Sequence, residues 1–217
     1  MSKTDKKNPR VGDMRAYIDS GLQLIPLHIW NAVDRKGRDR GKTPRDGAWQ
    51  AKDYDSAGVI ELCAKAGINA GVRLPPTIMV LDVDPRNFPA GRDSLAELVA
   101  DMKLDLSVAP HVITGSGGHH YYFTKPADAD LMDSLETYQG IEFKSAGRQV
   151  VSAGSIHPCG KHYEWDDFGP SLDSMPPMPE VLIRLCRRPT RAHGDAAAQR
   201  ATLARLAARF PRNVKVN

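Results

Sequence analysis

Residues 77–86 read TIMVLDVDPR, and this stretch decides the fold. Four apolar residues precede the first acid, which predicts a strand at the centre of a sheet. Alternate side chains of a strand share one face, so Asp82 and Asp84 point the same way while their neighbours enter the core. Two carboxylates on one face repel each other, and Mg²⁺ resolves this conflict because it favours carboxylates plus substrate phosphates. The stretch indicates a metal site, although two acids that simply face water at a strand end would give the same pattern.

A glycine-rich turn follows in TGSGGHHYYF, residues 114–123. Glycines let the backbone turn and expose consecutive N–H groups, a shape that accommodates phosphate oxygens. Ser116 and an imidazole just after the turn could donate hydrogen bonds to a triphosphate. The flanking residues predict a β-hairpin, and an ordinary glycine-rich hairpin with incidental histidines is the alternative.

A third polar position lies in GIEFK, residues 140–144. Glu142 sits between apolar neighbours on a predicted strand, which is unusual unless its carboxylate is paired or bound to a metal. Lys144 shares the face of Glu142 and could either neutralise it or hold a phosphate. A salt bridge within the strand explains the same residues as well as a metal ligand does.

The order of the expected elements indicates one α/β domain, of the α+β type, with a mixed or antiparallel sheet. We expect strands at about 22–30, 69–73, 77–83, 110–115, 119–124, 140–144, 148–153 and 162–165. Helices are expected at about 11–21, 56–66, 93–103, 128–137 and 180–187. We assign residues 1–10 to a disordered tail, 11–188 to the folded domain, and 189–217 to a basic helical tail or linker, with helical spacing over 195–209.

Composition narrows the class of protein. The 217 residues, 41% hydrophobic and 26% charged, suit a soluble globular chain, and the absence of 18 consecutive apolar residues excludes a transmembrane helix. The polar N-terminus lacks the apolar region of a signal peptide, and three dispersed cysteines fit a reducing cytoplasm. The chain has a net charge of +4, with basic residues concentrated at its two ends and a mildly acidic body between them. This distribution suits a polyanionic partner at the margins or merely aids solubility.

Two further segments have open interpretations. Residues 31–48 form a long basic loop that could bind nucleic-acid phosphates or could simply be solvated, and flanking Trp30 and Trp49 could stack bases or join the core. Residues 157–162 read HPCGKH and offer three soft metal ligands, but a structural zinc site needs a fourth. A turn between two strands explains the same residues and is the favoured interpretation.

Together these segments resemble the bifunctional primase-polymerase (prim-pol) N-terminal domain of the archaeo-eukaryotic primase superfamily. The family pattern is a D-x-D strand, an S-G-G-x-H hairpin and an acid after an apolar residue, matched here by 82–84, 116–120 and 141–142. The register places His120, and not His119, at the family histidine. Glu142 stands where many members have Asp, with the same ligand chemistry. The resemblance covers about residues 20–168 and includes GKTP (41–44), NAGVR (69–73) and GKHYEW (160–165).

The resemblance implies a primase-like catalytic core over residues 11–188, with a mixed or antiparallel sheet of RRM-like type. It implies template-directed nucleotidyl transfer, including primer synthesis, for replication of a plasmid, phage or integrated element. Two Mg²⁺ or Mn²⁺ ions would be held by Asp82, Asp84 and Glu142. The implied catalytic residues are these three acids and His120.

The resemblance also implies the substrate contacts. The nucleotide would contact Ser116, Gly117, His120, Lys144 and Arg148. We expect DNA contacts from Arg38, Arg40, Lys42 and Arg73. The implied partners are single-stranded template DNA, a primer, NTP or dNTP, and a replicative helicase, because many relatives carry a P-loop helicase downstream. The same acids would also suit a metal-dependent nuclease, and a non-catalytic module that binds single strands or origins is the other alternative.

Overall fold

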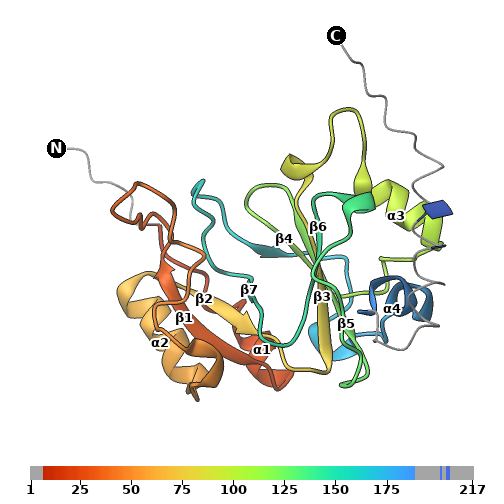
Figure 1. Cartoon of the computed structure of the whole chain (residues 1–217). Helices are drawn as coiled ribbons and strands as arrows, with labels where there is room; N and C mark the ends of the chain where they lie inside the picture. Colours follow the sequence, from red (N-terminus) through yellow and green to blue (C-terminus); the bar gives the residue numbers. More distant parts are fainter. Residues whose placement is uncertain (1–6, 189–200, 202–203, 206–217) are drawn as a thin grey trace, which may run out of the picture.

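The computed structural model describes residues 7–188, 201, 204 and 205, and it contains two antiparallel sheets (Figure 1). The three-stranded sheet has the order β1-β2-β7 and the five-stranded sheet the order β6-β3-β5-β4-β8. The strands are Gln23–Ile29 (β1), Ile68–Arg73 (β2), Ile78–Val83 (β3), His111–Ile113 (β4), His119–Thr124 (β5), Ile141–Lys144 (β6), Gln149–Val151 (β7) and Glu164–Trp165 (β8). The expected α+β class with antiparallel pairing is confirmed, but the single expected sheet is divided into two.

Four α-helices accompany the sheets in the described part of the chain: Arg15–Asp19 (α1), Ser56–Ala66 (α2), Ser94–Met102 (α3) and Glu180–Cys186 (α4). Aspartate caps start the two longest helices, because the Asp55 and Asp93 carboxylates accept hydrogen bonds from backbone N–H groups of the first turns. Gly67 ends α2 in the left-handed conformation that favours glycine. Both helices match the sequence prediction.

The helix expected over 128–137 is wrong, since only a short 3₁₀ turn forms there, Glu136–Tyr138. The backbone instead bonds to distant elements: Met132 N–H donates to Cys186 O at the end of α4, and Phe143 N–H donates to Asp133 O. These tertiary bonds replace the helical ones. The basic helix expected at 195–209 falls outside the described residues apart from 201, 204 and 205, which are helical.

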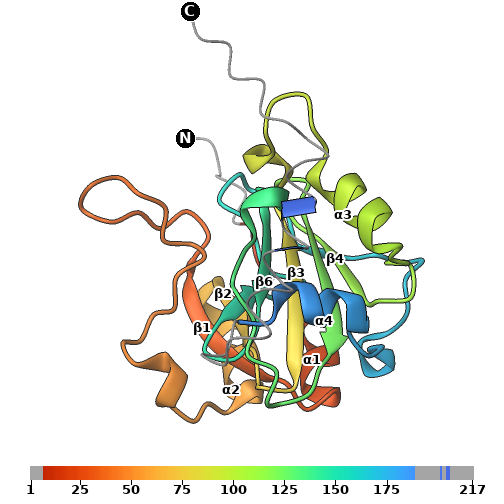
Figure 2. The same ribbon diagram turned by 45° about the vertical axis from the view of Figure 1, so that its right-hand side comes forward.

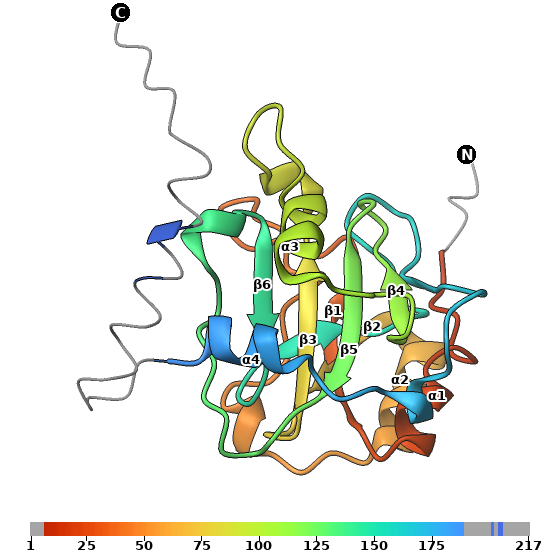
Figure 3. The ribbon, with the colours of Figure 1, turned by 90° about the vertical axis from the view of Figure 1, so that its right-hand side faces the viewer.

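Strand β3 is apolar on both faces because it lies at the centre of the molecule. Met79, Leu81 and Val83 pack on the side that α3 and α4 cover (Figure 3). Ile78 and Val80 face the other way, into the core shared with the three-stranded sheet. One step further along that inner face, the next side chain is the carboxylate of Asp82. The face of β3 that points toward the three-stranded sheet is therefore apolar at Ile78 and Val80 and acidic at Asp82.

The basic segment 31–48 projects beyond β1 as a long loop (Figure 2). Two backbone hydrogen bonds connect its returning arm to β1. His28 N–H donates to Thr43 O at 3.0 Å, and Arg45 N–H donates to Pro26 O at 3.0 Å. The tip of the loop is therefore exposed, while its returning arm is fixed beside the sheet.

Candidate active site

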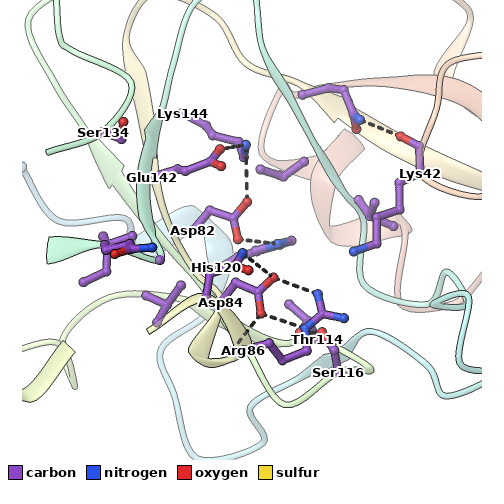
Figure 4. A pocket seen from close by; sticks show the side chains of 18 of the residues that line it. Lys42, Asp82, Asp84, Arg86, Thr114, Ser116, His120, Ser134, Glu142 and Lys144 are labelled. Atoms are coloured by element: carbon purple, nitrogen blue, oxygen red, sulfur yellow. Dashed lines mark hydrogen bonds and ion pairs between the residues drawn. The ribbon is translucent and has the colours of Figure 1, made fainter. Parts of the chain in front are cut away.

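Three polar side chains form one row across neighbouring strands. Strand β3 pairs with β5 and with β6, and the registers place Asp82 opposite His120 on one side and opposite Glu142 on the other. Side chains that are directly opposite each other in a sheet share a face. Asp84 continues the same face just beyond the end of β3, where its N–H donates to Gly140 O at 2.8 Å. We call Asp82, Asp84 and Glu142 the acidic row (Figure 4).

A lysine neutralises part of the acidic row. The Lys144 ammonium contacts the Glu142 carboxylate and lies 3.5 Å from Asp82 Oδ2. Burial alone would lower the pKa of Lys144, but the combined charges and hydrogen bonds of Asp82 and Glu142 raise it. Of the two roles that the sequence allowed for Lys144, the structure shows the neutralising one.

An arginine neutralises the rest of the row. The Arg86 guanidinium binds Asp84 in a bidentate pair, with Nε–Oδ1 at 2.8 Å and Nη2–Oδ2 at 2.7 Å. The Arg86 hydrogen bonds lower the pKa of Asp84. Sequence reasoning gave Arg86 no role, although it lies two residues after Asp84, within reach of the carboxylate.

His120 is the buried member of the site, 4% exposed. Its Nε2 lies 3.5 Å from Asp82 Oδ1, and its Nδ1 is buried with no hydrogen-bond partner among the described residues. Burial lowers the pKa of His120, more than the Asp82 charge raises it. Burial thus favours the neutral imidazole of His120, a form that can donate one hydrogen bond and accept another.

The hairpin that follows β4 is packed against the end of β3. A Cβ atom added at Gly118 would overlap the Val83 carbonyl oxygen, so this close approach requires glycine. Gly117 has φ +82, and the Thr114 hydroxyl accepts the Gly118 N–H at 2.9 Å. Ser116 Oγ lies 3.1 Å from that same hydroxyl. The turn therefore places two hydroxyl groups beside the acidic row.

A cavity of about 740 Å³ opens between the two sheets. It collects most of the side chains that the sequence singled out, namely Lys42, Asp82, Asp84, Ser116, His120, Glu142 and Lys144. Its walls also include polar residues that sequence reasoning missed, Arg86, Asn87, Thr114, Ser134, Gln149 and Tyr163. Figure 4 shows Lys42 reaching toward the acidic row from the opposite wall.

Comparison with known families identifies the family of the chain. The model of the bifunctional DNA primase/polymerase, N-terminal (Prim-Pol) family matches residues 14–181, which include the entire cavity. The chain belongs to the Prim-Pol family. Membership implies nucleotidyltransferase activity with DNA and nucleotide substrates at the level of the family. No curated protein matches this Prim-Pol chain, and none of its described helices is long and apolar enough to cross a membrane.

Several predicted contact residues of this Prim-Pol domain lie away from the cavity. Arg148 pairs with Asp133, and Arg73 donates to the backbone oxygens of residues 50 and 52. Arg38 pairs with Asp34 in the loop, and Arg40 lies 3.2 Å from the His28 ring. Gly117 belongs to the hairpin but does not line the cavity. The structure thus joins the acidic row, His120 and Ser116, but not these residues.

No three His, Cys, Asp or Glu side chains converge as a ready-made metal-binding group within residues 7–188 of the Prim-Pol chain. The reason is visible in the acidic row, whose carboxylates turn toward Lys144 and Arg86 rather than toward a common point. At residues 157–162, His157 Nδ1 accepts the Cys159 N–H and the Cys159 thiol donates to Gly115 O. These contacts support the turn interpretation of that segment over a zinc site.

Proposed function

We propose that this chain is a DNA primase-polymerase that adds nucleotides to a 3′ end on a single-stranded DNA template, by a two-metal mechanism and in the service of DNA replication. The observation that carries the proposal is the row of Asp82, His120 and Glu142 across three paired strands, with Asp84 next to it in the same cavity. A cavity between sheets that combines acids, hydroxyls and cations suits a nucleotide with its metal ions.

The donor set of the acidic row fits Mg²⁺ or Mn²⁺, since Asp82, Asp84 and Glu142 offer only carboxylate oxygens. Lys144 and Arg86 offset only two of the three negative charges of the row, so the row retains negative charge and already holds cationic groups before metal binds. Bound there, two such ions would supply charge neutralisation at the α-phosphate and at the departing pyrophosphate. These three acids are therefore the proposed metal ligands.

The other residues of the cavity would bind and orient the substrates. The His120 imidazole and the hydroxyl of Ser116 can donate hydrogen bonds to phosphate oxygens, and Lys144 adds a positive charge beside them. No side-chain nucleophile is needed, because positioning and charge stabilisation supply most of the catalysis in phosphoryl transfer.

Replacing His120 by alanine should raise the KM for nucleotide and lower kcat/KM about 10- to 100-fold, because a charge-assisted hydrogen bond to phosphate is lost. His119 is the matched control. It faces away from the cavity, with His111 Nε2 2.7 Å from its Nδ1. Steady-state primer extension by the His119→Ala and His120→Ala variants checks the assignment. A larger loss of kcat/KM in the His119 variant would show that His119, and not His120, is the family histidine.

Replacing Arg86 by glutamine should strengthen Mn²⁺ binding about two- to fivefold, because the guanidinium competes with a metal ion for Asp84 and such exposed pairs are weak. Electron paramagnetic resonance of free Mn²⁺ measures this without any turnover. Weaker Mn²⁺ binding in Arg86→Gln would show that Arg86 assists the site instead of competing for it. Arg184→Gln, which alters an exposed pair on α4, is the control.

A primer-free reaction on circular single-stranded DNA with labelled NTPs or dNTPs tests the proposed function directly. Labelled product of primer length that grows with time is the expected result with either Mg²⁺ or Mn²⁺. The same mixture without nucleotides separates the alternatives: strand cleavage indicates a nuclease, and binding with neither cleavage nor synthesis indicates a non-catalytic module.

A further inference from the structure

Three cationic side chains line the cavity in the described chain: Lys42, Arg86 and Lys144. Arg86 is bound to Asp84, and Lys144 is bound to Asp82 and Glu142. The Lys42 ammonium differs, since no carboxylate of the residues that the structure describes lies within 4.0 Å of it. Among the described residues, Lys42 is therefore a cation of the cavity without an ion-pair partner.

The backbone of Lys42 is fixed, unlike the exposed tip of its loop. Asn69, which is completely buried, donates from Nδ2 to Gly41 O at 3.0 Å, and Gln149 on β7 donates from Nε2 to Lys42 O at 3.0 Å. Gly41 itself packs so closely on the Trp30 backbone that a Cβ atom would overlap it. Lys42 is thus held at the cavity wall by both sheet contacts and close packing, as expected of a binding residue.

The electrostatics around Lys42 favour an anion. Desolvation lowers the pKa of the Lys42 ammonium and the positive charge of Arg86 lowers it further, while the more distant acids Asp82, Asp84 and Asp39 offset this only in part. The pKa of neighbouring His157 falls to about 4, first through burial and then through the charges of Lys42 and Arg86. An anion placed between Lys42 and Arg86 would relieve this repulsion.

We propose that Lys42 binds the β- and γ-phosphates of the incoming nucleoside triphosphate, and that it belongs to the nucleotide site and not to the DNA contacts expected of the 31–48 loop. This inference rests on the proposed function. The α-phosphate must lie at the acidic row, where the reaction occurs, whereas Lys42 stands on the opposite wall and reaches toward it (Figure 4). The β- and γ-phosphates therefore extend toward Lys42. Their negative charge provides the anionic partner that the Lys42 ammonium lacks among the described residues.

Binding without turnover separates the two possible ligands of Lys42. The α,β-methylene analogues of dATP and ATP cannot be incorporated, and dAMP lacks the two terminal phosphates. For Lys42→Ala we expect calorimetric titration to show binding of the analogues weakened about 10- to 100-fold. The Kd values for dAMP and for a single-stranded oligonucleotide should stay unchanged, and Lys42→Arg should restore part of the analogue affinity. Lys65→Ala, an exposed lysine of α2 paired with Glu61, controls for loss of one charge.

The titrations of Lys42→Ala distinguish three interpretations. If Lys42→Ala weakens oligonucleotide binding but not analogue binding, Lys42 contacts DNA as first expected of the 31–48 loop. If the variant binds both ligands as the wild type does, Lys42 is a solvated surface lysine. Either result overturns the inference, as would equal loss of dAMP and triphosphate analogue. A wild-type protein that binds the analogues through Lys42 yet incorporates no nucleotide would refute the proposed function while the Lys42 assignment stands. The side chain is exposed to the cavity, so equal melting temperatures of the variants will show that folding is intact.

Discussion

Replacing Asp82 and Asp84 together by alanine is expected to abolish nucleotide incorporation on a primed template, a loss of at least about 1000-fold. The two side chains supply most of the oxygen ligands proposed for the metal ions, and both line the cavity. Their removal leaves Arg86 without the Asp84 carboxylate and leaves Lys144 with Glu142 alone. Primer extension with labelled nucleotides measures the effect.

The control for this double variant is Asp19→Ala with Asp128→Ala, which removes two exposed acids from other parts of the surface. Both double variants should melt within a few degrees of the wild type, because the pairs lost at the acidic row are partly exposed and contribute only about 0–1 kcal/mol each. Incorporation retained by the Asp82 and Asp84 variant would contradict the assignment of the site.

Replacing Gly118 by alanine is expected to destabilise the fold by about 1–3 kcal/mol and to reduce incorporation about 100-fold. The added methyl group would overlap the Val83 carbonyl oxygen, a backbone atom that cannot turn aside. The hairpin must then move away from β3, and it carries Ser116 and leads directly into His120. Urea denaturation and primer extension measure the two effects.

Gly12→Ala is the matched control for Gly118→Ala, because a methyl group at Gly12 meets nothing within 4 Å. We expect a stability change within about 0.5 kcal/mol and unchanged incorporation for this variant. If Gly118→Ala behaves like its control, the hairpin is not packed against β3 as described, and the placement of Ser116 beside the acidic row fails with it.

The sheet face that carries the site could be predicted because strands alternate with a period of two. The pattern of residues 77–86 was enough to put Asp82 and Asp84 on one side, and an acid between apolar residues marked Glu142. The glycine-rich turn similarly marked the hairpin before His120. These predictions are local, since each needs only a few neighbouring residues and the geometry of one element.

The ion pairs of the site could not be predicted in this way. Lys144 reaches Asp82 only because β6 pairs with β3 in one particular register, and a shift of one residue would turn it to the other face. Arg148 follows in the same segment of sequence, yet its partner is Asp133 outside the cavity. The family resemblance implied a nucleotide contact for both residues, and strand pairing placed only Lys144 in the cavity.

The sequence by itself determined which acids share a strand face, because this depends on the alternation within single strands. The resemblance of its motifs, in their order, to the Prim-Pol pattern pointed to His120 and to the family. Only the tertiary structure decided that two sheets, and not one, enclose the site, and that Lys42 enters it while Arg38 and Arg40 stay in the loop. The physical reason is that Lys42 is held by Asn69 and Gln149, which are distant in the chain and meet it only after folding.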